Sequence, residues 1–254
     1  MNQSDHRRQH DAHPTLAGLT HPDKDVRQQT AVALGSRADP LLAHAVASLL
    51  WGESDFFVRE TLTWVLTRTP AAAVEAATQA LTDPDPAVRT QALHVLSKIK
   101  HPDSAAAVAV CLDDQDTAVV ERARWALARI GDPSVLPVLI TRLGQVDLAG
   151  RDSLTSALAQ FGASAVPPLV TALTASDPSI RMHAADVLCY IGSPHTAEAT
   201  PELVNALDDA DPDVRLSAVM ALRELTDHRD ARAAMAQAIT HDDPRVAGVA
   251  RASV

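Results

Sequence analysis

The stretch "DPAVRTQALHVL", residues 85–96, decides the fold because its pattern recurs along the whole chain. An aspartate comes first, an aliphatic residue follows three positions later and is usually followed by arginine, and a leucine stands eleven positions after the aspartate. Successive copies begin 30 to 34 residues apart, a period typical of helical repeat proteins. The copies begin at Asp23, Asp55, Asp85, Asp116, Asp147, Asp177 and Asp211, with a shortened copy at Asp243.

Each copy predicts one amphipathic helix, which we call helix B. Counted from the aspartate, the apolar positions +3, +7, +10, +11 and +14 lie on one helical face at 100° per residue. The aspartate itself is placed to accept hydrogen bonds from the first free backbone N–H groups of that helix. Position +11 is leucine in all seven full copies: Leu34, Leu66, Leu96, Leu127, Leu158, Leu188 and Leu222.

A second apolar segment, helix A, lies between successive copies, as in "DPLLAHAVASLL" (39–50) and "AAAVEAATQAL" (71–81). Two helices in every thirty or so residues can bury their apolar faces only by stacking copy on copy. The pattern therefore predicts an all-α solenoid of about eight two-helix repeats. We expect one continuous solenoid over residues 13–254, preceded by a flexible N-terminal segment at residues 1–12.

The repeat, carried as clearly by "DPAVRTQALHVLSKI" as by any copy, resembles the HEAT-like repeat family in the short form found in phycobilisome lyases and many bacterial proteins. The resemblance covers about residues 13–254 and implies a right-handed α-solenoid with helix A on the convex side and helix B on the concave side. The family includes scaffolds, lyases, hydroxylases and DNA-repair enzymes, so the resemblance implies a fold and leaves the function open.

Composition excludes some kinds of partner. The net charge of -10 argues against general affinity for nucleic acid or anionic membranes, which need clustered positive charge. No apolar stretch is long enough for a membrane span, and the N-terminus has no export signal, so we predict a cytoplasmic protein. The two distant cysteines, Cys111 and Cys189, are expected to be buried free thiols.

Arginine recurs at position +4, on the border of the buried face. Our interpretation is structural: each arginine bonds an aspartate or a carbonyl oxygen in its own or an adjacent repeat. The alternative is a ladder of anion-binding arginines, which Val120 would interrupt. The arginines are Arg27, Arg59, Arg89, Arg151, Arg181 and Arg215, and Val120 and Ala247 are the exceptions.

No catalytic set is apparent in the sequence. The motifs G-x-S-x-G and H-E-x-x-H are missing, no histidine is followed by glutamate, and no Cys/His spacing is typical of a metal site. We therefore predict a protein that is not an enzyme, with no catalytic residues, metal or cofactor.

The candidate site comes from the face of helix B that lies opposite the buried one, at positions +5, +9 and +13. In three consecutive repeats position +9 is tryptophan, histidine and tryptophan, and position +13 is basic each time. Exposed aromatic rings beside arginine are typical interface anchors; alternatively, the rings pack between neighbouring repeats. The predicted binding residues are Glu60, Trp64, Arg68, His94, Lys98, Glu121, Trp125 and Arg129.

Three other aromatic residues lie close to Trp64 in the sequence. Trp51 ends a helix A segment, and Phe56 and Phe57 follow the aspartate of the second copy. We expect these three to form a local plug or an edge contact at the turn before helix B.

The sequence predicts a non-catalytic scaffold that binds a protein segment or other ligand on its concave groove. Two alternatives remain. One is an enzyme similar to the alkylpurine DNA glycosylases built from HEAT-like repeats, for which Glu60 and Glu121 beside the tryptophans supply the ingredients and the negative charge is unfavourable. The other is a tetrapyrrole-handling protein similar to bilin lyases. The oligomeric state is left open.

Overall fold

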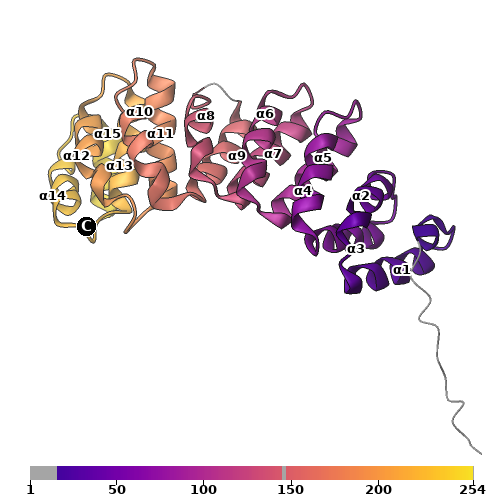
Figure 1. Ribbon diagram of the computed structural model, residues 1–254. Coiled ribbons are helices and arrows are strands. Elements are labelled where there is room, and N and C mark those ends of the chain that lie inside the picture. Colours follow the sequence, from indigo (N-terminus) through magenta and orange to yellow (C-terminus); the bar gives the residue numbers. More distant parts are fainter. Residues whose placement is uncertain (1–15, 145–146, 254) are drawn as a thin grey trace, which may run out of the picture. The chain divides into compact units, whose positions relative to one another are not determined.

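The computed structural model describes residues 16–144 and 147–253, and these residues form α-helices and short 3₁₀ helices, with no strand among them (Figure 1). The predicted all-α solenoid class is confirmed. The predicted flexible segment at residues 1–12 lies outside the described residues.

Every predicted helix B is present, and its leading aspartate caps it as expected. In the second copy an Asp55 carboxylate oxygen accepts hydrogen bonds from the backbone N–H groups of Phe57 and Val58 at 2.9 and 3.1 Å. The other seven leading aspartates also accept at least one such bond. These helices are α1 (Lys24–Arg37), α3 (Phe56–Thr67), α5 (Pro86–Ile99), α7 (Thr117–Ile130), α9 (Leu148–Ala159), α11 (Pro178–Ile191), α13 (Pro212–Arg223) and α15 (Pro244–Ala252).

The A segments are also helical, although several begin or end in a 3₁₀ turn. The A segment between α7 and α9 begins with a 3₁₀ helix at Pro133–Val135, which precedes α8. The segment is not one longer α-helix because Pro137 lacks the N–H that such a helix would need there. The A helices are α2 (Ala43–Trp51), α4 (Pro70–Ala80), α6 (Ala105–Val110), α8 (Leu136–Ile140), α10 (Val166–Ala172), α12 (Thr200–Asn205) and α14 (Arg229–Ala238). The 3₁₀ helices are Leu16–Thr20, Pro40–Leu42, Pro102–Ser104, Cys111–Asp113, Pro133–Val135, Gly162–Ala165, Ala197–Ala199 and Ala206–Asp208.

The helices form two compact units, with the division between Ile99 and Lys100. In the first unit α1 packs on α3 and α3 packs on α5. In the second unit the B helices α7, α9, α11, α13 and α15 each pack on the next in chain order. The prediction of one continuous solenoid across residues 13–254 stays a prediction.

The core of each unit is built from the apolar face that the repeat predicts. The seven leucines at position +11 are all buried. Burial of a leucine side chain contributes about 1.5–3 kcal/mol, so this one column is a major source of stability. The rest of the core is mainly alanine, valine and leucine, as the composition indicates.

Two of the sequence interpretations need correction. Phe56 and Phe57 form an edge-to-face pair with ring centroids 5.5 Å apart, yet they are 58% and 69% exposed. Neither ring is therefore a buried plug, because the first turn of α3 points these positions away from the core, and the alternative of an edge contact stays a prediction. Cys111 is buried, as predicted, whereas Cys189 is only partly buried.

Candidate functional site

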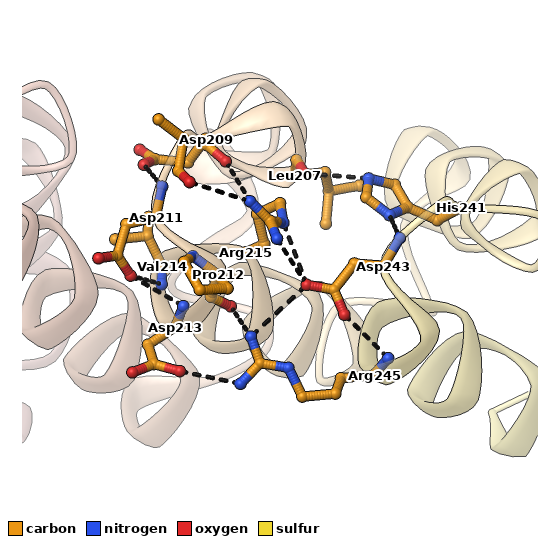
Figure 2. Close-up of polar contacts among 11 residues, drawn as sticks. Leu207, Asp209, Asp211, Pro212, Asp213, Val214, Arg215, His241, Asp243 and Arg245 are labelled. Atoms are coloured by element: carbon orange, nitrogen blue, oxygen red, sulfur yellow. Dashed lines mark hydrogen bonds and ion pairs between the residues drawn. The ribbon is translucent and has the colours of Figure 1, made fainter.

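The recurring arginines have the structural role that we favoured. Figure 2 shows the clearest case, in which Arg215 Nη1 donates to the carbonyl oxygens of Asp209 and Ala210 at 2.7 and 3.2 Å. Its Nη2 also reaches Asp243 of the next repeat at 2.8 Å. Together with the bond that Asp243 accepts from the Arg245 backbone N–H, this contact lowers the Asp243 pKa to about 2.

The same arrangement recurs in other repeats. Arg181 donates to the carbonyl oxygens of Ala175 and Ser176 and forms a two-point ion pair with Asp209. Arg27 likewise pairs with Glu53, Arg59 and Arg89 hold the carbonyl oxygens of their own turns, and Arg151 pairs with Asp186. Each arginine thus fixes a turn, a carboxylate of an adjacent repeat, or both, and none needs an anionic ligand to explain it.

Val120 interrupts this series, and a different arginine lies one turn later. Arg124 is only 7% exposed, and its Nη1 donates to the Gly150 carbonyl oxygen of α9 at 3.3 Å. Its Nε has no hydrogen-bond partner among the described residues. Burial lowers the pKa of this guanidinium below its usual value. A buried guanidinium therefore adds to the packing of α7 against α9.

Trp64 is neither fully exposed nor fully packed. The ring is 41% exposed, and its six-membered part lies against Gly35 of α1, the preceding B helix. A Cβ atom at position 35 would lie 2.7 Å from both Cε3 and Cη2 of Trp64 and closer still to Cζ3. The missing side chain of Gly35 is therefore what allows the indole to lie this close to α1.

We expect Gly35→Ala to displace the Trp64 ring toward solvent. The added methyl group overlaps the ring, whereas helix propensity alone would favour alanine by about 1 kcal/mol. The two effects oppose each other, so the thermal midpoint should change little while the Trp64 emission moves to longer wavelength. The measurement is fluorescence in a background with Trp51 and Trp125 changed to Phe. Gly248→Ala, where a Cβ meets nothing within 4 Å, is the control, and unchanged emission in the Gly35 variant would contradict the packing.

The other predicted residues of the first unit lie on α3 or at its end, and on α5, which packs against α3. Glu60 on α3 and His94 on α5 are joined by a contact of 2.9 Å between Oε1 and Nε2. Arg68 at the end of α3 and Lys98 on α5 are exposed. The structure thus brings Glu60 and His94 together directly.

In the second unit, Trp125 on α7 is 39% exposed and lies close to two guanidinium groups. The Arg122 and Arg129 Cζ atoms are 4.9 and 5.9 Å from the ring centroid, within the range of cation–π attraction. Arg122 was not among the predicted residues, although it stands three positions before Trp125 and therefore on the same helix face. Glu121, one turn before Trp125, is exposed.

A pocket of about 320 Å³ opens beside this ring, between α7 and α9. Its lining combines apolar surface with hydroxyl and amide groups, and we call it the Trp125 pocket. The lining residues are Trp125, Ala128, Arg129, Ser153, Ser156, Ala157 and Gln160.

A second pocket, of about 480 Å³, lies between α9 and α11 and shares Ser156 with the first. We call it the Tyr190 pocket, after a ring that is 68% exposed. The lining residues are Arg151, Asp152, Thr155, Ser156, Asp186 and Tyr190. The two pockets together make a surface over α7, α9 and α11 of the second unit.

The predicted residues thus fall into two sets. Trp64, Arg68, Lys98, Glu60 and His94 belong to the first unit, and Glu121, Trp125 and Arg129 belong to the second. That both sets form one binding surface stays a prediction. Among the described residues, no three His, Cys, Asp or Glu side chains are grouped so that they could hold a metal ion.

Comparison with known proteins identifies the repeat. The family model described as HEAT repeats matches residues 74–159 and 200–252, together more than half of the chain. No curated protein matches the chain. Across the described residues, no helix is both long enough and apolar enough to span a membrane.

Three solved structures illustrate the similar folds. The complex of CpcE and CpcF of phycocyanin lyase from Nostoc sp. PCC7120 is 20% identical, with 100% of this chain and 99% of that chain covered and a TM-score of 0.43. Human deoxyhypusine hydroxylase in complex with glycerol is 18% identical, with 87% and 97% covered and a TM-score of 0.36. An engineered protein is 21% identical, with 94% and 76% covered and a TM-score of 0.42. None of these likenesses carries an argument about what this chain binds.

Proposed function

Because the chain belongs to the HEAT-repeat family, we propose that it is a non-catalytic binding protein that holds a protein segment on the α7–α9–α11 surface of its second unit. The observation that carries the proposal is Trp125. Its indole is partly exposed, flanked by two guanidinium groups and adjacent to a pocket.

A large ring in this position is suited to anchor a partner. Trp and Arg are enriched among the residues that dominate binding energy, and such residues lie where water is excluded on binding. Arg122 and Arg129 both lie within the range of cation–π attraction to the ring, which restricts the indole and lowers the entropy that it loses on association. The neighbouring pocket of about 320 Å³ is large enough to receive an apolar side chain of the partner.

The polar lining of the Trp125 pocket indicates a peptide. Ser153, Ser156 and Gln160 offer hydroxyl and amide groups that can both donate and accept hydrogen bonds, as a peptide backbone requires. Nucleic acid is disfavoured, because the chain's charge of -10 opposes the phosphate contacts that would dominate its affinity. A protein segment with an apolar anchor fits these groups best.

No specific observation favours the two alternatives. The glycosylase-like function needs a carboxylate beside a tryptophan. The Glu60 carboxylate contacts His94, Glu121 is exposed one turn before Trp125, and the net charge of -10 opposes the phosphate contacts of such an enzyme. The bilin lyase-like function has only the general presence of acidic and aromatic side chains. That the chain is not an enzyme and that it is cytoplasmic stay predictions.

The test is selection of peptides from a random dodecapeptide phage library on the purified full-length protein. We expect selected peptides to share an apolar anchor, and Trp125→Ala to raise their Kd at least tenfold, about 1.4 kcal/mol. Fluorescence anisotropy of labelled peptides gives the Kd, and circular dichroism should show unchanged helicity, because the ring is not part of the core.

Val110→Ala is the matched control for that experiment. Val110 is 72% exposed and ends α6, an A helix outside both pockets, so its truncation removes exposed apolar surface, although less than the indole has, away from the proposed site. The control should leave Kd unchanged. Peptides that bind the Trp125→Ala variant as tightly as the original protein would refute the proposed site.

A further inference from the structure

The two pockets of the α7–α9–α11 surface differ in charge. Around the Trp125 pocket, Arg122 and Arg129 lie against the ring, and Glu121 lies one turn away on the same helix. Neither arginine forms an ion pair with a carboxylate among the described residues. Two positive charges and one negative charge leave this end of the surface with an excess of one positive charge.

The Tyr190 pocket has the opposite balance. Arg151 and Asp186 form an ion pair there, so their charges largely cancel. Asp152 is exposed, and within residues 16–144 and 147–253 it has no ion-pair partner. One carboxylate therefore remains uncompensated beside the exposed ring of Tyr190.

A carboxylate next to an aromatic face is suited to a cationic group. The carboxylate can accept charge-assisted hydrogen bonds from an ammonium or guanidinium, and the ring face attracts the same charge. Arg151 opposes a second cation at its own position, but its charge is engaged by Asp186. An anionic side chain would meet the uncompensated Asp152 and would be repelled.

We infer that the bound protein segment places a lysine or arginine side chain in the Tyr190 pocket when its apolar anchor occupies the Trp125 pocket. This inference rests on the proposed function and adds to it the charge and the direction of the segment. The opposite direction would place the cation near Arg122 and Arg129 and leave Asp152 without a partner.

The packing of the helices sets the spacing of the two side chains. The pockets lie on either side of α9 and meet at Ser156, so their centres are separated by roughly one interhelical distance, about 8–10 Å. An extended peptide advances about 3.3 Å per residue. The basic side chain and the apolar anchor should therefore stand roughly two to four positions apart.

Repeating the library selection on two variants tests this inference. On the original protein we expect lysine or arginine to be enriched at one fixed offset from the apolar anchor. On Asp152→Lys, aspartate or glutamate should replace it at that offset, while the apolar anchor stays the same. A selected basic peptide should lose at least fivefold in affinity for the Asp152→Lys protein.

Glu198→Lys is the charge-matched control, because Glu198 is exposed and precedes the A helix α12, outside both pockets. It should keep the preference for a basic residue. If no basic residue is enriched, or if Asp152→Lys keeps the same preference, the inference is wrong. The proposed function would still hold in that case as long as Trp125→Ala weakens binding, and it fails only if Trp125→Ala does not.

Discussion

Replacing Gly144 by alanine is expected to destabilise the second unit by about 3 kcal/mol, through added backbone strain and overpacking. Gly144 has a φ of +75°, where a residue with a Cβ is strained by about 1–2 kcal/mol. The new Cβ would also lie 2.9 Å from the backbone nitrogen of Ile180 and even closer to Ser179 Oγ. The Ile180 backbone belongs to α11 and cannot move aside as a flexible side chain could.

Gly131→Ala separates the two causes. Gly131 has nearly the same φ, +73°, but the nearest atom to an added Cβ is the Ala128 carbonyl oxygen at 4.0 Å. This variant should therefore lose only the strain of about 1–2 kcal/mol. Urea unfolding followed by Trp125 emission, with Trp51 and Trp64 changed to Phe, reports on the second unit. Equal losses in the two variants would show that α11 does not approach Gly144 as closely as described.

The second large effect is a loss of stability on mild acidification, caused by His183. This side chain of α11 is fully buried, and its Nδ1 accepts a hydrogen bond from the Gly144 backbone N–H at 3.3 Å. Nε2 therefore carries the proton and faces Thr155 Oγ1 at 3.0 Å. Protonation of Nδ1 would break the hydrogen bond from the Gly144 N–H, so His183 is held as the neutral imidazole.

Burial is the main reason that the pKa of His183 falls from 6.5 to about 4. The nearby positive charges of Arg151 and Arg124 lower this pKa further, and Asp186 raises it. Because the unfolded chain takes up the proton first, stability is complete above pH 6.5 and decreases as the pH falls to about 4. The total loss over that window is about 3 kcal/mol.

The variant His183→Gln tests whether His183 causes this loss of stability, because glutamine does not titrate. Urea unfolding of both proteins from pH 7.5 to pH 4 should give a free-energy difference that shrinks by about 3 kcal/mol as the pH falls. Three carboxylates also have lowered pKa values in the folded protein: Glu53, Asp209 and Asp243. The stability that they contribute is lost on protonation, mainly below this pH window. A difference independent of pH would show that His183 is not held neutral.

The sequence predicted the fold because the repeat links each residue type to one position. The periodicity of helix B placed the leucine at +11 in the core. The aspartate at the start was placed to accept hydrogen bonds from the first backbone N–H groups of the helix. The same reasoning placed Trp125 on the exposed face, since +9 is opposite to the buried column. The exposure of Trp125 and Trp64 follows from helical periodicity alone.

What the repeat could not predict depends on contacts between particular copies. The packing of Trp64 relies on a glycine in the preceding helix, and nothing in the copy that contains Trp64 indicates it. Gly144 lies outside the repeated pattern, so its approach to α11 and its bond to His183 had no sequence signal. The sequence predicted that Arg151 bonds an aspartate or a carbonyl oxygen, but it could not predict that the partner is Asp186, because position +9 is acidic in this copy alone among the seven full ones.

The substitution of Val120 for the recurring arginine has a mechanical consequence. Elsewhere in the second unit, sheltered ion pairs such as those of Arg181 and Arg215 join one repeat to the next. Between the fourth and fifth repeats the ion pair is Arg142 with Asp113, whose carboxylate is largely in solvent and adds little rigidity. This junction therefore has an exposed ion pair where the junctions of Arg181 and Arg215 have sheltered ones, and the Trp125 pocket lies across it. A segment that wedges apart α7 and α9 would meet little resistance from this ion pair.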